Sequence, residues 1–292
     1  MKKKRKIKVL FANFWQGRKA DLHLQHLEKQ LRTTDIIFGS EVEAQMSGDK
    51  IAAEKHPMYA RVHDGKVMIN HANVLFERYR ENFHCEYVGE NERTYDCRAT
   101  GNIFERTQYG NIMLISRRLK VVATGSAFIF GTFAYRGPDK HFASPRVLQY
   151  VVIEENGSLY LFAHFHGLWI YGNTKGDCPE RDEQSAQVLE ALRLVSAETG
   201  ATRIIFGGDF NLDITTKALQ TLEEGYGDVQ FNNAIKAKGI TGTRSRHYRH
   251  FADPQHSNFA DYVMYSLNVT LHKLRLCGAR ASDHLHVLVE VT

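Results

Sequence analysis

Short, almost continuously apolar runs recur along the 292-residue chain, and each of them ends on or near a polar residue. Runs of about four to eight apolar residues without alternation are typical of strands that are covered on both faces. The pattern therefore predicts a set of buried strands whose ends present polar side chains. We expect these strands at residues 6–14, 35–41, 111–116, 159–166, 203–211, 259–266 and 282–291.

Apolar residues at helical spacing lie between some of these strands. Residues 22–31 and 183–196 each place apolar side chains on one face, which predicts two amphipathic helices. A short helix is expected over residues 215–222, after a glycine- and aspartate-rich turn. Gly200 is expected to end the longer helix as its C-cap.

Successive antiparallel strands are indicated across residues 120–153, and Glu155-Asn156-Gly157 predicts a tight hairpin turn. Parallel and antiparallel strands therefore mix, with helices outside them. Two sheets packed face to face, each covered by helices, would bury these strands in one domain, although one large mixed sheet also fits the pattern. No internal repeat or linker is found, so we expect a single domain over residues 1–292, with a basic tail at residues 1–6.

The composition is that of a folded protein without a membrane-spanning helix. Hydrophobic residues make up 43% of the chain and charged residues 24%, a balance that argues against disorder. No apolar run reaches about 18 residues, so no transmembrane helix is expected. The basic N-terminal run lacks the features of a signal peptide, and we interpret it as a solvated charge cluster rather than a nuclear address. The 4 scattered cysteines indicate free thiols, which favours a cytoplasmic location.

The polar residues at the strand ends form an oxygen-rich set. Open α/β folds gather their functional groups at strand ends and in the loops that follow them. The set contains carboxylates, amides and imidazoles but no thiolates, and hard oxygen ligands select Mg²⁺ or Mn²⁺ over zinc. The formal net charge of +5 also suits a phosphorylated substrate, without requiring one. The residues are Asn13, Glu41, His164, His166, Asp209, Asn211, Asp261, Asp283 and His284.

Two places in this set carry the most specific chemistry. Gly207 and Gly208 let the backbone bend after a buried strand, and Asp209 and Asn211 would share one face of an extended segment. One of the two could orient a water while the other donates to a phosphoryl oxygen, although an ordinary Asp/Asn turn gives the same local pattern. Asp261 lies inside an apolar strand, where a carboxylate needs a partner, and a histidine is a natural one.

Taken in order, these motifs resemble those of the endonuclease/exonuclease/phosphatase superfamily, which includes deoxyribonuclease I. The order is an Asn, a Glu, YGNIMLISR, a His, GDFN, an Asp in an apolar strand, and a late SDH. The resemblance runs from about residue 6 to residue 292. It implies a four-layer α/β/β/α sandwich of two mixed β-sheets flanked by helices, and metal-dependent hydrolysis of a phosphoester by direct attack of an activated water.

The resemblance also implies which residues would hold the cation and the water. Glu41 would ligate Mg²⁺ or Mn²⁺, with Asn13 close by and Asp283 on the metal side. Asp209 would orient or deprotonate the attacking water. Asn211 would position this water or the phosphate.

The remaining roles concern the phosphate and the leaving group. Asp261 would pair with His284, which would stabilise negative charge on the phosphoryl group or act as a base. His164 would lie near the phosphate and the leaving group. His166 is placed beside them, with a structural role as the alternative.

Basic residues indicate where a substrate would bind. Arg244 and Arg246 lie just before the strand that carries Asp261, so their loop could overhang the site and hold a phosphodiester backbone. A solvated loop is the alternative. Arg181 follows Asp177-Cys178-Pro179 and is either a phosphate contact or part of an ion pair at the start of a helix.

The function hypothesis is a metal-dependent phosphodiesterase, a nuclease first, that acts on nucleic acid as a monomer. A phosphatase or phospholipase-C-like hydrolase of sugar phosphates or lipids is the alternative, and a catalytically silent binding protein on the same fold is a further one. No exposed aromatic hairpin for membrane insertion is evident, which disfavours the lipase hypothesis. The retention of every polar strand-end residue disfavours the silent protein.

Overall fold

We describe the protein from a computed structural model, which covers residues 5–48, 50–63, 65–96, 104–135, 144–170, 175–251 and 257–292. Residues 1–4 of the expected basic tail lie outside these ranges. Within them, no helix is long and apolar enough to cross a membrane.

The first sheet contains seven of the described strands, with β1 near its centre. β1 runs parallel to β2 and antiparallel to β17, so the sheet is mixed. In spatial order the strands are β10 (Ala134–Tyr135), β7 (Phe83–Asp96), β8 (Phe104–Ser116), β2 (Ile36–Ala44), β1 (Ile7–Asn13), β17 (His286–Val291) and β16 (Leu271–Cys277).

The second sheet contains six of the described strands and is also mixed. β12 and β13 are parallel, whereas the other neighbours are antiparallel. In spatial order the strands are β14 (Phe231–Asn233), β15 (Asp261–Ser266), β13 (Arg203–Asp209), β12 (Ser158–Phe165), β11 (Arg146–Glu155) and β9 (Lys120–Phe130).

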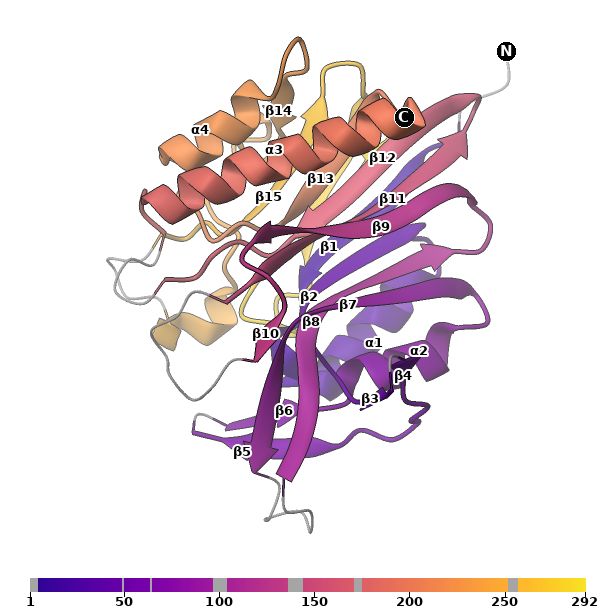
Figure 1. The fold of residues 1–292 in the computed structure, drawn as a ribbon, viewed down its shortest axis with the longest axis vertical. Helices are drawn as coiled ribbons and strands as arrows, with labels where there is room; N and C mark the ends of the chain where they lie inside the picture. The colour runs from indigo at the N-terminus through magenta and orange to yellow at the C-terminus, as the bar shows by residue number, and fades with distance from the viewer. Residues whose placement is uncertain are drawn as a thin grey trace.

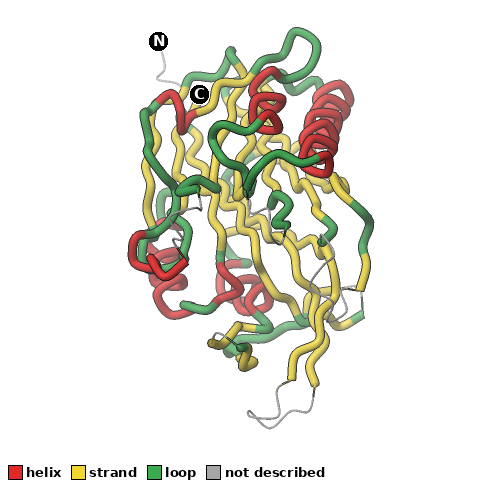
Figure 2. The backbone as a smooth tube through the Cα atoms, turned by 90° about the vertical axis from the view of Figure 1, so that its left-hand side faces the viewer, coloured by secondary structure: helices red, strands yellow, loops and turns green. Residues whose placement is uncertain are grey.

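Helices cover the outer faces of the two sheets. α3 (Pro179–Thr199) and α4 (Lys217–Glu224) lie on one side of the molecule, and α1 (Ala20–Leu31) and α2 (His71–Tyr79) lie on the other (Figure 1). A view turned by 90° shows the strands between these helices (Figure 2). The four-layer sandwich is confirmed, and the alternative of one large mixed sheet is wrong. The shorter elements are β3 (Met46–Ser47), β4 (Lys50–Ile51), β5 (Tyr59–Val62), β6 (Gly65–Met68), α5 (Ala234–Ala237) and the 3₁₀ turns η1 (Trp15–Gly17) and η3 (Arg246–Phe251).

Both faces of the central strands are buried, which explains their continuous apolar runs. In β1, Phe11 points into the space between the sheets and its ring stacks on Phe38 of β2 with centroids 5.5 Å apart. Its neighbour Leu10 points the other way and packs with Leu27 of α1. Because successive side chains of a strand alternate between faces, one run of residues fills two cores.

The predicted turn and cap have the expected conformations. Asn156 and Gly157 both have positive φ, 53° and 71°, and connect β11 to β12 in a hairpin that pairs Glu155 with Ser158. This is the turn that best matches the twist of the two strands. Gly200 ends α3 in the left-handed region with φ 75°.

The long hairpin of β7 and β8 differs most from the expectation. Only residues 111–116 were predicted as a strand here, but β8 begins at Phe104 and β7 precedes it. The residues of β7 include Glu90, Asn91 and Arg93, which are too polar to read as a buried strand. Several of these side chains are buried because they form a polar network behind a cavity, described below.

The last strand also starts later than expected. β17 begins at His286, whereas residues 282–285 form a loop that bonds to the segment before β15. The N–H of Ser245 donates to the carbonyl of Asp283 at 2.8 Å, and the N–H of Leu285 donates to the carbonyl of Thr243 at 2.7 Å. These bonds fix the segment that carries Asp283 and His284.

Four histidines gather between the first sheet and its helices. The His23 ring lies 5.2 Å from that of His71 and 5.7 Å from that of His286, which in turn lies 5.0 Å from His26. The ring nitrogens of His23 and His71 have no hydrogen-bond partner among the described residues. Burial lowers the pKa of His71 to about 3, and burial with nearby Arg275 lowers that of His26 to about 4. These rings are therefore packed as neutral groups.

We expect the free energy of unfolding to fall as the pH drops below about 6.5, the ordinary pKa of histidine. The unfolded chain then takes up protons that the buried rings reject until the pH approaches 3. His71 alone should cost about 2 kcal/mol between pH 6.5 and pH 5. Urea unfolding of the wild type, His71→Leu and the exposed control His63→Gln at both pH values checks this. An equal pH-dependent loss in all three proteins would contradict it.

Candidate active site

Polar residues from both sheets meet at one end of the sandwich. Asn13 is the last residue of β1, and its neighbour in β2 is Ser40, next to Glu41. In the other sheet Asp209 ends β13 and lies opposite Asp261, the first residue of β15. The expected assembly of strand ends therefore exists, and it spans the interface between the two sheets.

Glu41 reaches this assembly because β2 bulges. β2 pairs regularly with β8 up to Gly39 and again from Val42, and the register shifts between them. Glu41 itself has a φ of 59°, which residues other than glycine seldom adopt. A bulge removes a side chain from the alternation of its strand. The Glu41 carboxylate is thereby directed toward Asn13.

The amide of Asn13 joins two carboxylates. Its Nδ2 donates to Oε1 of Glu41 at 2.9 Å and to Oδ2 of Asp209 at 3.0 Å. Its Oδ1 accepts the N–H of Trp15 at 2.8 Å. Asn13 was expected close to the metal. Since its oxygen is already engaged, Asn13 holds the two carboxylates in place.

The turn after β13 shapes the next part of the site. Gly208 has a φ of 136°, and a side chain there would meet the carbonyl oxygen of Phe165. The N–H of Asn211 donates to Oδ1 of Asp209 at 3.0 Å, and its Nδ2 donates to the carbonyl of Gly167 at 3.2 Å. Asn211 has a φ of 51°. The segment from Asp209 to Asn211 is therefore a tight turn, one of the two alternatives that the sequence left open.

His284 and Asp261 form a buried pair, as the sequence led us to expect. Nδ1 of His284 lies 2.8 Å from Oδ2 of Asp261, and its Nε2 lies 3.5 Å from Oδ2 of Asp209 and 3.9 Å from Oδ2 of Asp283. The guanidinium of Arg244 also contacts this ring. Burial and Arg244 lower the pKa of His284, but the three carboxylates outweigh both and raise it to about 9.

The charges around Asp209 and Glu41 act in opposite directions. Burial would raise the pKa of Asp209, but His284 and His166 outweigh burial and hold it well below its usual value. The pKa of Glu41 is raised by burial and by the neighbouring carboxylate of Asp283. The groups around Glu41 therefore supply too little positive charge to offset its carboxylate. A bound cation would supply that charge.

The side chains present fit a divalent cation. Ligand atoms of Glu41, His166 and Asp209 lie within 4.8 Å of one another, as do those of Asp209, Asp261 and His284. The first group combines two carboxylates with one imidazole, and Asp283 adds a further carboxylate at the cavity wall. Carboxylate oxygens suit Mg²⁺ and Mn²⁺.

A cavity of about 410 Å³ opens onto these groups. Most of the site residues expected from the sequence line it: Glu41, His166, Asp209, Asn211, Arg244, Asp283 and His284. Asn13 and Asp261 are buried and bond to these residues. Arg146 lines the cavity too, and the walls that the sequence did not indicate are Trp15, Gln16, Arg18, Arg93, Tyr109 and Trp169.

Two of these arginines are fixed by buried carboxylates. Nη1 of Arg146 donates to Oε2 of Glu90 at 2.9 Å, and Nη1 of Arg93 donates to Oε1 of Glu43 at 3.3 Å. The Arg93 guanidinium also lies 3.5 Å from the centre of the Tyr109 ring. Charged residues are rarely buried unless they are paired. The run of charged residues in β7 is buried here because its members pair with residues of other strands.

His166, which directly follows β12, is the histidine that the structure brings to the cavity, and His164 within β12 is not. His164 is fully buried between the sheets, where its ring stacks on Phe38 with centroids 5.5 Å apart. Burial lowers its pKa to about 3. His164 and His166 are two positions apart, which corresponds to about 7 Å along an extended chain. This distance is enough to place one ring in the core and the other at the cavity. The ring of His166 lies 3.4 Å from the hydroxyl of Tyr109.

Arg181 and Arg246 are not among the residues that line the cavity. Arg181 is 1% exposed, and its guanidinium donates to the carbonyls of Leu168 and Gly176. It therefore holds the loop that follows β12. Arg246 is exposed on η3, next to the Arg244 segment.

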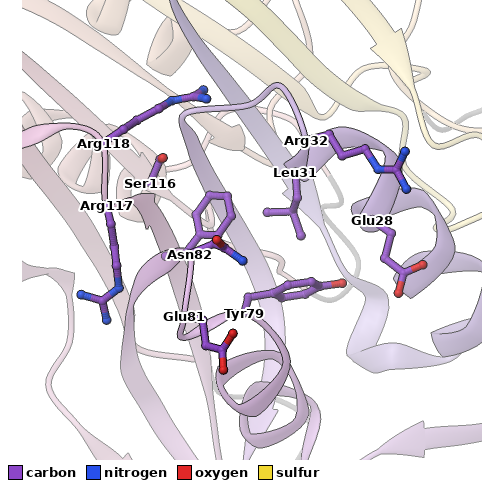
Figure 3. A pocket seen from close by; sticks show the side chains of 10 residues that line it. Glu28, Leu31, Arg32, Tyr79, Glu81, Asn82, Ser116, Arg117 and Arg118 are labelled. Atoms are coloured by element: carbon purple, nitrogen blue, oxygen red, sulfur yellow. The ribbon is translucent and has the colours of Figure 1, made fainter.

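A larger cavity of about 760 Å³ lies elsewhere, and Figure 3 shows its lining. It contains Arg117 and Arg118, which the sequence marked as basic. Arg117 donates to the carbonyl of Arg80, and Arg118 pairs with Asp35 at 2.8 Å. These arginines therefore brace the fold, and neither histidine-containing ligand group lies in this cavity.

Residues 12–284 match the model of the Endonuclease/Exonuclease/phosphatase family. No curated protein sequence matches the chain.

Solved structures resemble the whole chain at low sequence identity. The Bacteroides thetaiotaomicron mannosyl-6-phosphatase is 15% identical, with a TM-score of 0.63, over 98% of this chain and 99% of that chain. The truncated Caenorhabditis elegans TDP2 is 13% identical, with a TM-score of 0.59, over 98% and 97%. The human nocturnin catalytic domain is 15% identical, with a TM-score of 0.61, over 98% and 94%. These likenesses show a shared fold.

We expect Glu90→Gln to lower the free energy of unfolding by about 3–5 kcal/mol, because it leaves the buried Arg146 without a charged partner. The double variant Glu90→Leu with Arg146→Met removes both charges and should recover most of this loss. Glu86→Gln, on the partly exposed face of the same strand, is the control. Urea unfolding of all four proteins measures the effect. A Glu90→Gln loss no larger than that of the control would show that the pair is not a buried ion pair.

Proposed function

Because this chain belongs to the endonuclease/exonuclease/phosphatase family, we propose that it hydrolyses a phosphoester bond with the help of a divalent cation, Mg²⁺ or Mn²⁺. The observation that carries the proposal is the meeting of Glu41, His166 and Asp209 within 4.8 Å, beside the pair of His284 with Asp261. Few chemical tasks need carboxylates, imidazoles and an amide in one buried cluster that opens onto a cavity.

Glu41 and Asp283 would hold the cation, with Asp209 beside it. When bound, a divalent cation offsets negative charge on a phosphoryl oxygen and lowers the pKa of a water. The hydrogen bonds of Asn13 keep Glu41 and Asp209 in position before any ligand arrives. This preorganisation reduces the rearrangement that binding would otherwise require.

The protein's own groups would orient the reacting atoms. Asp209 is an acceptor that can align an attacking water, because its low pKa keeps it ionised. The ring of His284 can donate from Nε2 to a phosphoryl oxygen while Asp261 fixes the opposite nitrogen at 2.8 Å. Asn211 sits on the same turn as Asp209 and can position the water or the phosphate. Arg244 adds positive charge beside His284.

We assign to His166 the place beside the phosphate and leaving group that the sequence had suggested for His164. His166 lines the cavity, and its Nε2 lies 3.6 Å from Oδ2 of Asp209. The hydroxyl of Tyr109 contacts its other nitrogen and orients the ring. His164 then serves as a core residue.

A nuclease remains the first hypothesis for the substrate, and a phosphatase or phospholipase-C-like hydrolase remains the alternative. The similar structures include a mannosyl-6-phosphatase, which keeps the phosphatase alternative open. Arg244 supports an anionic substrate of either kind. A silent binding protein is disfavoured by the complete polar cluster. We expect a cytoplasmic monomer organised as one domain.

We expect hydrolysis of any phosphoester to stop in excess EDTA and to return when Mg²⁺ or Mn²⁺ is added. Glu41→Gln should weaken cation binding at least tenfold, because it removes one charged ligand, while Glu86→Gln should not change it. Calorimetric titration with Mn²⁺ measures the affinity, and a phosphoester panel of DNA, RNA, sphingomyelin and sugar phosphates measures turnover. Full turnover in EDTA, or an unchanged Mn²⁺ affinity in Glu41→Gln, would exclude this assignment.

We expect Asp209→Asn and His284→Ala each to lower kcat by about 10²–10⁴-fold, the range of groups that act in the transition state. Asp213→Asn, on the same turn as Asp209 but outside the cavity lining, is the matched control and should retain activity. The double variant should lose less than the product of the two single losses, since both groups serve one step. Single-turnover hydrolysis gives the rates. Near-wild-type rates in both single variants would remove the catalytic assignment.

A further inference from the structure

Both tryptophans of the chain line the cavity that holds the proposed metal site. The protein has only 2 tryptophans, and they are separated by more than 150 positions in the sequence, at Trp15 and Trp169. Trp169 follows β12 and is 45% exposed. A large, partly exposed aromatic side chain in a cavity that is otherwise rich in charge can contact the flat face of a ligand.

The backbone at Trp15 is strained in the same way as that of the catalytic residues. Among the described residues, positive φ occurs at five positions other than glycine. One is Asn156 in the hairpin turn, and the other four, Trp15, Gln16, Glu41 and Asn211, all line the cavity. Such conformations are unfavourable for bulky residues and cluster at functional sites. Trp15 is thus placed at the cavity by the fold, against its own conformational preference.

Contacts hold Trp15 in this position. The backbone N–H of Trp15 donates to Oδ1 of Asn13 at 2.8 Å, so the residue that joins Glu41 and Asp209 also fixes the tryptophan backbone. Tyr248 of η3 meets the indole at 66° with centroids 5.0 Å apart, and the Arg18 guanidinium lies 5.5 Å from the ring centre. Tyr248 is anchored in turn by its hydroxyl, which donates to the carbonyl of Arg280 at 2.8 Å.

We propose that Trp15 and Trp169 form a stacking subsite for the nucleobase of a nucleotide or oligonucleotide substrate. The proposal rests on the proposed function, because the phosphate would lie at the cluster of Glu41, His166 and Asp209 in the same cavity. Aromatic side chains accept bases of any sequence, since every base presents a flat π-face. Gln16 and Arg18, beside Trp15 on the cavity wall, can bond to the polar edges of a base.

A base is favoured over a bare sugar by this combination of groups. The phosphate of a sugar phosphate could bind at the metal site and Arg244. Its sugar ring is not flat and carries hydroxyl groups, so it would stack poorly on the indoles. A nucleobase supplies both a flat apolar face and a polar edge. The subsite therefore discriminates substrates that carry the same phosphate.

Matched ligands test this in the full-length protein. Asp209→Asn is used with Mg²⁺ to prevent turnover, and AMP, ribose 5-phosphate and glucose 6-phosphate are titrated while tryptophan fluorescence is recorded. AMP and ribose 5-phosphate share the phosphate and the sugar and differ in the base. AMP should bind roughly 5- to 150-fold more tightly, the equivalent of about 1–3 kcal/mol for one stacked base. Equal affinity for the three ligands, or tighter binding of either sugar phosphate, would overturn the proposal.

Variants of the two tryptophans assign the effect. Trp169→Ala, in the same Asp209→Asn background, should bring the affinity for AMP close to that for ribose 5-phosphate and leave the latter unchanged. Trp169→Phe should keep most of the preference. Phe128→Ala, which removes a 41% exposed ring from β9 outside the cavity lining, is the control and should behave like its parent.

Trp15→Gly separates stacking from a structural role. Glycine suits a φ of 46° better than tryptophan does, so the melting temperature should not fall, while the preference for AMP should decrease. A lower melting temperature with an unchanged preference would make Trp15 a structural residue and limit the subsite to Trp169. An unchanged preference in both Trp15→Gly and Trp169→Ala would exclude the subsite.

Turnover by the wild type distinguishes this inference from the proposed function. If AMP, short oligonucleotides and sugar phosphates are all hydrolysed equally well, the function stands and the subsite fails. If none is hydrolysed but AMP still binds more tightly than ribose 5-phosphate, the subsite stands and the catalytic proposal fails.

Discussion

The site depends on the repulsion among carboxylates that the fold forces together at one end of two sheets. Glu41, Asp209, Asp261 and Asp283 meet within a small volume, and Asp209 and Asp261 are almost fully buried. An isolated buried carboxylate is too costly to keep ionised. The amide of Asn13 and the ring of His284 therefore each contact two or more of these groups. Much of the surrounding structure, from the bulge at Glu41 to the loop of residues 282–285, serves to place these compensating side chains.

Much of this arrangement could be predicted from the sequence. Apolar runs such as residues 203–209 mark strands because burial on both faces leaves no room for alternation. Asp209 stands where such a run stops. Asp261 needed a partner because it sits inside an apolar strand, and His284 is that partner at 2.8 Å. These inferences succeed because the cost of burying charge is a local property that a sequence displays.

Other features depend on geometry that the sequence does not display. His164 and His166 have the same side chain and are two positions apart, but His164 is buried within β12, whereas His166 follows the strand and lines the cavity. The sequence left Arg181 as either a phosphate contact or part of an ion pair at the start of a helix, and its guanidinium donates to the carbonyls of Leu168 and Gly176. The polar strand β7 escaped notice because Glu90 and Arg93 are buried with partners from other strands. For Arg181 and β7, contacts with residues distant in the sequence allow polar side chains to be buried.

The pairing of β1 with β17 has a consequence for how the protein folds during synthesis. Phe11 lies opposite Val287, so all of the chain between these two strands must be made before this edge of β1 is covered. Contacts of such long sequence separation slow folding, and they leave an apolar edge open to other chains until they form. His284 emerges from the ribosome just before β17 and closes the charge cluster at the same stage. The charge cluster and the cover of this strand edge therefore form at the same stage of synthesis.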